Sequence, residues 1–154
     1  MTLPTDDSQT AAASLEAAIN DALNQHSRGN LVQAEKQYRA VLVKAPKHAV
    51  ALHYLGVIAL QTNNADQAIE LISQSIVQAP DYADAYSNLA NAYQAKGRFK
   101  DAAESLEKTL ELTDAATSPN PEIRANLGNA YAQLSNFQSA AVNYQRAIAI
   151  GREQ

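Results

Sequence analysis

The sequence contains no cysteine and no tryptophan, and only five glycines and five prolines among its 154 residues. Without cysteine, the chain can form neither disulfides nor thiolate metal sites. Charged residues make up 18% of the chain, below the ~25% of a typical soluble domain, and Lys and Arg never cluster beyond a pair. Since nucleic-acid binding relies on such cations to neutralise phosphates, no nucleic-acid partner is expected.

Long apolar runs and catalytic motifs are also lacking. No stretch approaches the ~20 apolar residues of a membrane span, and MTLPTDDSQT lacks the basic and apolar regions of a secretory signal. We therefore expect a cytoplasmic protein that does not bind membranes. His26, His48 and His53 have no metal-ligand spacing, and no nucleophile elbow or phosphate-binding loop occurs. We expect no catalytic residue, metal or cofactor, and hence no enzyme.

What the chain does contain is alanine, its most frequent residue, together with many asparagines and glutamines. Alanine is the strongest helix former because it loses no side-chain entropy. The composition therefore predicts an all-helical protein whose surface is partly amide rather than ionic.

A pattern of small and aromatic residues recurs four times along the chain. Its clearest copy runs from Leu89-Ala90 through Tyr93, Gly97, Phe99 and Ala102. The other copies are centred on Asp21-Ala22, Leu55-Gly56 and Leu127-Gly128; the first three copies are evenly spaced, and the fourth follows after a slightly longer step. Over residues 15–152 this pattern resembles the tetratricopeptide repeat family, whose repeats are about 34 residues long. It is similar in particular to the repeat region of O-linked N-acetylglucosamine transferases.

The resemblance implies an all-α, right-handed superhelical solenoid of about four antiparallel helix pairs. The repeats are expected at about 15–48, 49–82, 83–116 and 121–154, within a domain spanning 10–154. Small residues let the two helices of each pair approach closely. These are Ala22, Gly56, Ala90 and Gly128, each facing an alanine twelve positions later. Larger residues should fill the space between pairs, namely Tyr38, Tyr93, Phe99, Tyr131, Phe137 and Tyr144.

Turn and cap residues mark the ends of the predicted helices. Gly29, Asn63, Gly97 and Ser135 stand where each first helix must stop, and Pro46 and Pro80 follow the second helices. An insertion near 113–120 predicts a longer loop, after which Asn120 and Pro121 restart a helix as N-cap and first-turn residues. Residues 1–9 are polar and expected to be disordered.

The last predicted helix keeps an apolar stripe where a fifth repeat would pack. The stripe consists of Ala141, Tyr144, Ala147 and Ile148. A stack that ends without a polar cap exposes this surface, so we expect either a longer protein or self-association through this C-terminal helix.

In the family that the chain resembles, first helices line a concave groove that accepts a partner peptide. The positions flanking each Leu-Gly pair should face this groove. They are Asn20, Leu23, Tyr54, Val57, Asn88, Asn91, Asn126 and Asn129, with His53 beside them. Asparagine amides offer both a donor and an acceptor to a peptide backbone. They resemble the asparagine ladder of the transferases, interrupted here by Tyr54; packing and solubility are the alternative use of these amides.

The residues at these positions argue against a carboxylate clamp, the chaperone-binding version of the groove. That clamp needs Lys and Arg on the inner helices, whereas Asp84 and Glu122 occupy matching places here. The sequence instead predicts a scaffold that binds a neutral or mildly basic peptide with weak salt dependence. The alternative hypothesis is a substrate-recruiting arm of a larger glycosyltransferase or sulfotransferase.

Overall fold

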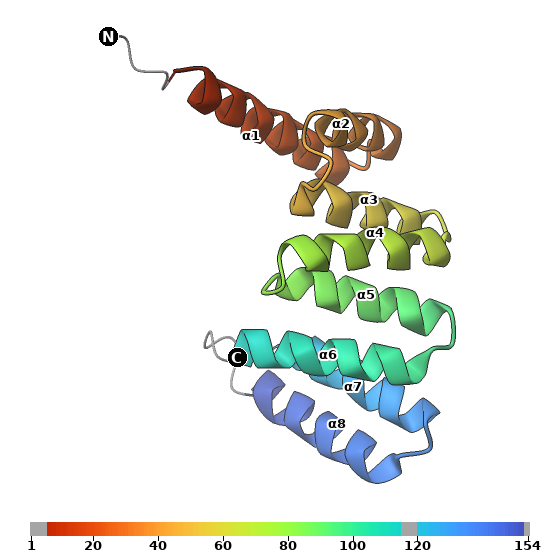
Figure 1. The fold of residues 1–154 in the computed structure, drawn as a ribbon. Coiled ribbons are helices and arrows are strands. Elements are labelled where there is room, and N and C mark those ends of the chain that lie inside the picture. Colours follow the sequence, from red (N-terminus) through yellow and green to blue (C-terminus); the bar gives the residue numbers. More distant parts are fainter. Residues whose placement is uncertain (1–5, 115–119, 153–154) are drawn as a thin grey trace.

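The computed structural model describes residues 6–114 and 120–152, and every regular element within these ranges is an α-helix (Figure 1). The helices pair into antiparallel hairpins that stack in sequence order from the N-terminal to the C-terminal end. The eight helices of the described residues are α1 (Asp6–Ser27), α2 (Leu31–Lys44), α3 (Ala49–Gln61), α4 (Ala65–Gln78), α5 (Ala83–Ala95), α6 (Phe99–Asp114), α7 (Pro121–Gln133) and α8 (Phe137–Arg152). This architecture confirms the predicted all-α solenoid.

Each hairpin turns through the same backbone motif. The turn residue has a positive φ in every case: 79° at Gly29, 60° at Asn63, 69° at Gly97 and 58° at Ser135. The residue that follows donates its N–H to the carbonyl five positions earlier, over 2.8 to 3.0 Å. This is the Schellman motif, which satisfies the last carbonyls of a helix. The predicted stop positions of the first helices are therefore confirmed.

The two helices of a hairpin cross where neither carries a bulky side chain. Ala22, Ala34, Ala68, Ala90 and Ala102 are completely buried. A Cβ atom built on Gly56 would lie 2.4 Å from Cγ1 of Ile72 and 3.3 Å from the carbonyl oxygen of Ala68. Close packing of this kind leaves no room for a methyl group, as the pairing of small residues predicts.

The hairpins are joined by one large residue from each second helix. Tyr38, Ile72 and Leu106 occupy the same position of three successive repeats, and each is 0% exposed. Around them, three apolar clusters run through the stack from α1 to α7. The equivalent residue of the last hairpin, Tyr144, is only partly buried because no further hairpin follows in the described chain.

The second helices end as the prolines require. α2 stops at Lys44 and α4 at Gln78, two residues before Pro46 and Pro80 respectively. At the corresponding place α6 has Asp114 instead of proline, and this helix continues for 16 residues rather than 14.

The predicted loop insertion lies mostly outside the described residues. Beyond it, Asn120 caps α7 by accepting hydrogen bonds from the backbone N–H groups of Glu122 and Ile123, at 2.9 and 3.4 Å.

Two expectations differ from the structure. α1 begins at Asp6, so residues 6–9 of the segment expected to be disordered are helical; the alanine-rich sequence that follows favours this extension. Residues 1–5 lie outside the described residues. Phe137 does not fill the space between pairs but is 70% exposed, because it begins α8, the last helix of the described stack.

The C-terminal stripe is only partly exposed. Ile148 is 56% exposed and Ala141 also faces solvent, whereas Tyr144 packs its ring against Gly128 of α7. Among the described residues, no helix is both long and apolar enough to cross a membrane.

Candidate peptide-binding face

Most of the residues predicted to bind a peptide lie at the surface of the first helices. Asn20, Asn91 and Asn129 are exposed, on α1, α5 and α7 respectively. The other accessible members of the set are half-buried: Leu23, Tyr54, Val57, Asn88 and Asn126. We call these eight residues the amide face. His53 is the exception, since only 2% of its surface is exposed.

The asparagines of the amide face differ in how their side chains are used. Asn88 places its amide nitrogen 2.9 Å from Nε2 of His53, and Asn129 accepts a 2.7 Å hydrogen bond from the Tyr144 hydroxyl. The side chains of Asn20, Asn91 and Asn126 form no hydrogen bond with any described residue. Those three amides therefore offer both donor and acceptor to a partner.

His53 links two repeats instead of facing the groove. Its Nδ1 lies 2.9 Å from the hydroxyl of Tyr82, in the turn before α5, and its Nε2 faces Asn88 on α5. Burial lowers the pKa of His53 to about 4, so the ring is neutral at pH 7. Because the Asn88 NH₂ can only donate, Nε2 accepts and Nδ1–H donates to Tyr82. Of the residues predicted for the peptide site, His53 is therefore the one buried between two repeats.

An aromatic cluster supports the N-terminal half of the amide face. Tyr54 stacks on the buried ring of Tyr38, with centroids 5.7 Å apart and planes at 12°. The rings of His26 and His53 make edge-to-face contacts with the ring of Tyr54, with centroids 5.5 and 4.8 Å away. Offset and edge-to-face arrangements of this kind fix aromatic side chains in place. Tyr54 therefore interrupts the row of asparagines as a rigid, half-buried aromatic.

Sequence reasoning missed Tyr82 as a partner of His53. Tyr82 stands in the connection after Pro80 and belongs to no recurring position of the repeat pattern. Its position before α5, directly after proline and aspartate, carried no signal of a contact with a residue 29 positions earlier. Only the stacking of hairpins brings the two together.

In the C-terminal half of the molecule, the first helix of each hairpin has an acidic residue near its start. Asp84 and Glu122 lie in the first turns of α5 and α7, and both are exposed. A carboxylate at a helix N-terminus is stabilised by the helix dipole, which gives these residues a structural role as well. Their charge disfavours an acidic ligand at this end of the face.

Stacked helical hairpins with polar side chains arrayed along the first helices define an α-solenoid scaffold. The tetratricopeptide repeat family profile matches residues 49–115 and 81–153. The chain belongs to the tetratricopeptide repeat family, and it is a protein-interaction scaffold.

The relatives agree with this assignment. Over 81 residues, 53% of this chain, it is 36% identical to UDP-N-acetylglucosamine–peptide N-acetylglucosaminyltransferase of Caenorhabditis elegans. Over 91% of this chain it is 26% identical to small glutamine-rich tetratricopeptide repeat-containing protein 2 of Mycosarcoma maydis. These matches span 7% and 38% of the two relatives' own lengths.

Solved structures show the same fold. MamA from Desulfovibrio magneticus RS-1 superposes with a TM-score of 0.79 at 20% identity, covering 91% of this chain and 77% of that one. A second MamA crystal structure gives a TM-score of 0.81 at 21% identity, covering 90% of this chain and 79% of that one.

Proposed function

We propose that the amide face binds an extended segment of a partner protein. The observation that carries this proposal is the set of three accessible amides, Asn20, Asn91 and Asn126, that make no side-chain hydrogen bond within the described residues. An extended peptide exposes unpaired backbone N–H and C=O groups, which such amides can pair with regardless of the peptide's side chains. Tyr54 and Val57 supply the apolar contact in the N-terminal half.

The ligand that fits best is neutral or mildly basic. Asp84 and Glu122 would repel a carboxylate-rich segment, and hydrogen bonds between neutral amides and backbone are little screened by salt. Binding should therefore be of modest affinity and weakly salt-dependent. In this proposal the chain acts in the cytoplasm as a holder of other proteins, without catalytic activity of its own.

The test replaces two free amides, Asn91→Ala with Asn126→Ala, and compares affinity capture from native lysate with the unmodified chain. A matched control, Gln78→Ala with Gln145→Ala, removes two exposed amides from the second helices. We expect partners to be captured by the unmodified chain and the control, and lost by the Asn91/Asn126 variant at unchanged helicity. Loss of capture on raising salt to about 0.5 M would contradict the amide mechanism.

A second candidate function is a substrate-recruiting arm of a larger transferase. The observation that favours it is the 36% identity to the peptide N-acetylglucosaminyltransferase of Caenorhabditis elegans. The two hypotheses differ in the expected size of the endogenous protein, which an antibody against this chain can detect. A transferase arm requires a product long enough to contain a catalytic domain.

Self-association through α8 also stays a proposal, supported by the exposure of Phe137 and Ile148.

A further inference from the structure

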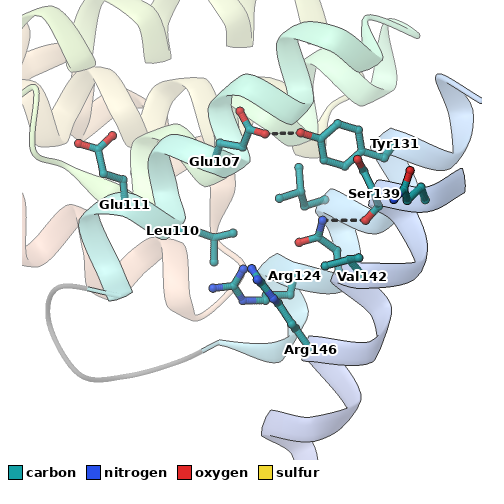
Figure 2. Close-up of a pocket in the computed structure, with 11 residues that line it drawn as sticks. Glu107, Leu110, Glu111, Arg124, Tyr131, Ser139, Val142 and Arg146 are labelled. Atoms are coloured by element: carbon teal, nitrogen blue, oxygen red, sulfur yellow. Dashed lines mark hydrogen bonds between the residues drawn. The ribbon is translucent and has the colours of Figure 1, made fainter. Parts of the chain in front are cut away.

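Surface recesses lie over two successive hairpins of the stack. The earlier one is formed by α5 and α6, is lined by Tyr86, Leu89 and Lys108 among others, and holds about 200 Å³. The later one has the equivalent residues of α7 and α8, namely Arg124, Leu127 and Arg146, and holds about 550 Å³ (Figure 2). It also reaches back to the preceding hairpin, where α6 forms its other wall. We call this later one the α6–α8 recess.

Two substitutions distinguish the later recess from the earlier one. The position of Tyr86 is Arg124 in the α6–α8 recess, and the position of Glu104 is Val142. Leu110 and Leu127 also line the recess but are only 6% and 3% exposed, whereas Val142 is 41% exposed. Val142 therefore supplies the apolar surface that a ligand can reach.

The recess and the amide face lie on opposite sides of α7. Arg124, Leu127 and Tyr131 are spaced by three and four residues and share one side of the helix. Asn126 and Asn129 lie roughly 140° to 160° around the helix from Arg124. Both sites can therefore be occupied at the same time.

The α6 and α8 walls of the recess carry opposite charge. On α6, Glu107 accepts a hydrogen bond from the Tyr131 hydroxyl, and Glu111 forms an ion pair within the helix at 2.9 Å. The hydrogen bond raises the pKa of Tyr131 to about 12, so the hydroxyl remains a donor at neutral pH. On α8, Arg146 is exposed and forms no hydrogen bond or ion pair with a described residue. Figure 2 shows Glu107 and Tyr131 at one end of the recess, and Arg124 and Arg146 at the other.

We propose that the α6–α8 recess is a second protein-binding site. It takes a partner segment in which an apolar side chain separates a basic side chain from an acidic one. The apolar side chain rests on Val142, the basic one faces Glu107 and Glu111, and the acidic one faces Arg146. The volume suits a few side chains of a short segment, within the range of ordinary ligand pockets.

The test uses three acetylated and amidated hexapeptides as probes, followed by amide chemical shifts of the ¹⁵N-labelled chain. KKLLEE separates the two charges, KELLEK has the same composition without separation, and KKLLKK is basic at both ends. We expect KKLLEE to bind with a Kd on the order of 1 mM, with shifts concentrated at Tyr131, Val142 and Arg146. KELLEK should bind about fivefold more weakly, the effect of one exposed charge pair.

A charge reversal at the α8 wall should switch the preference. In Arg146→Glu the recess has acidic residues on both walls, so KKLLEE should weaken about fivefold and KKLLKK should become the tighter ligand. Lys36→Glu, an exposed residue of α2, makes the same change in net charge away from the recess and should keep the original order. Arg146 is exposed, so an unchanged spectrum outside the recess verifies folding.

Three outcomes would overturn the proposal. They are equal binding of KKLLEE and KELLEK, an unchanged order of peptides in Arg146→Glu, and shifts at Asn91 and Asn126 instead of the recess. The variants in this test leave every residue of the amide face unchanged, so failure here leaves its proposed function intact.

Discussion

Gly56 illustrates how a single methyl group limits the packing of a hairpin. It is buried where α3 crosses α4, beside the completely buried Ile72. The neighbouring backbone oxygen of Ala68 cannot move aside without shifting α4. Interiors packed to this density respond to added volume with strain instead of relaxation.

Gly56→Ala should therefore lower the free energy of unfolding by about 1 to 3 kcal/mol, the usual cost of overpacking. Gly151→Ala is the matched control, because its Cβ would meet nothing within 4 Å and alanine favours the helix. It should leave stability unchanged or raise it slightly. Urea unfolding followed by circular dichroism measures both, and equal stability of the two variants would contradict the steric account.

At the scale of the helix, an asparagine that precedes a helix can contribute to stability in one place and hardly at all in another. Asn120 and Asn30 both precede a helix. The Asn120 side chain accepts from two backbone N–H groups of α7, whereas Asn30 makes no capping bond to α2. Its amide instead donates to Gln25 over 2.9 Å at an exposed site. α7 therefore depends on its cap more than α2 does.

Asn120→Ala should cost about 1 kcal/mol of unfolding free energy, the usual value for a lost N-cap. Asn30→Ala should cost less than about 0.5 kcal/mol, because no capping bond is lost. Amide hydrogen exchange adds a local readout: the first-turn amides of α7 should exchange faster in Asn120→Ala while α2 is unaffected. Similar losses in the two variants would mean that the capping geometry does not decide the cost.

Across the whole molecule, stability depends on how each hairpin docks on the next. His53 lies at such a junction, between α3 and α5, and it is buried and neutral. Burial has the largest effect on its pKa, while Asp84 nearby raises that pKa and His26 lowers it. Since the pKa of the folded state lies below the unfolded value of 6.5, the unfolded chain binds the proton first as pH falls.

The contribution of His53 to stability is fully present above pH ~6.5 and is lost progressively as pH falls toward about 4. Between pH ~7.5 and ~5.0 the loss should amount to about 2 kcal/mol. His53→Gln keeps a donor and an acceptor but does not titrate, so its unfolding free energy should fall less over this window. Urea unfolding at several pH values tests this, and identical slopes for both proteins would exclude His53 as the cause.

The chain's own sequence determined the number of hairpins, their turns and their crossings. Gly29, Asn63, Gly97 and Ser135 specify the turns because the required positive φ is a local property of the backbone. Small residues at the crossings recur at a fixed spacing and can be recognised without knowing their neighbours. The accessible positions of the amide face, such as Asn91, follow from the same helical periodicity.

Tertiary structure alone decided which polar side chains are used internally and where a recess remains. His53 occupies a position of the predicted groove, yet it is buried because Tyr82 and Asn88 approach it from the next hairpin. The α6–α8 recess likewise forms where α6 of one hairpin meets α7 and α8 of the next. Both depend on side chains brought together from different hairpins, and a repeat pattern records spacing within a hairpin but not the contacts between hairpins.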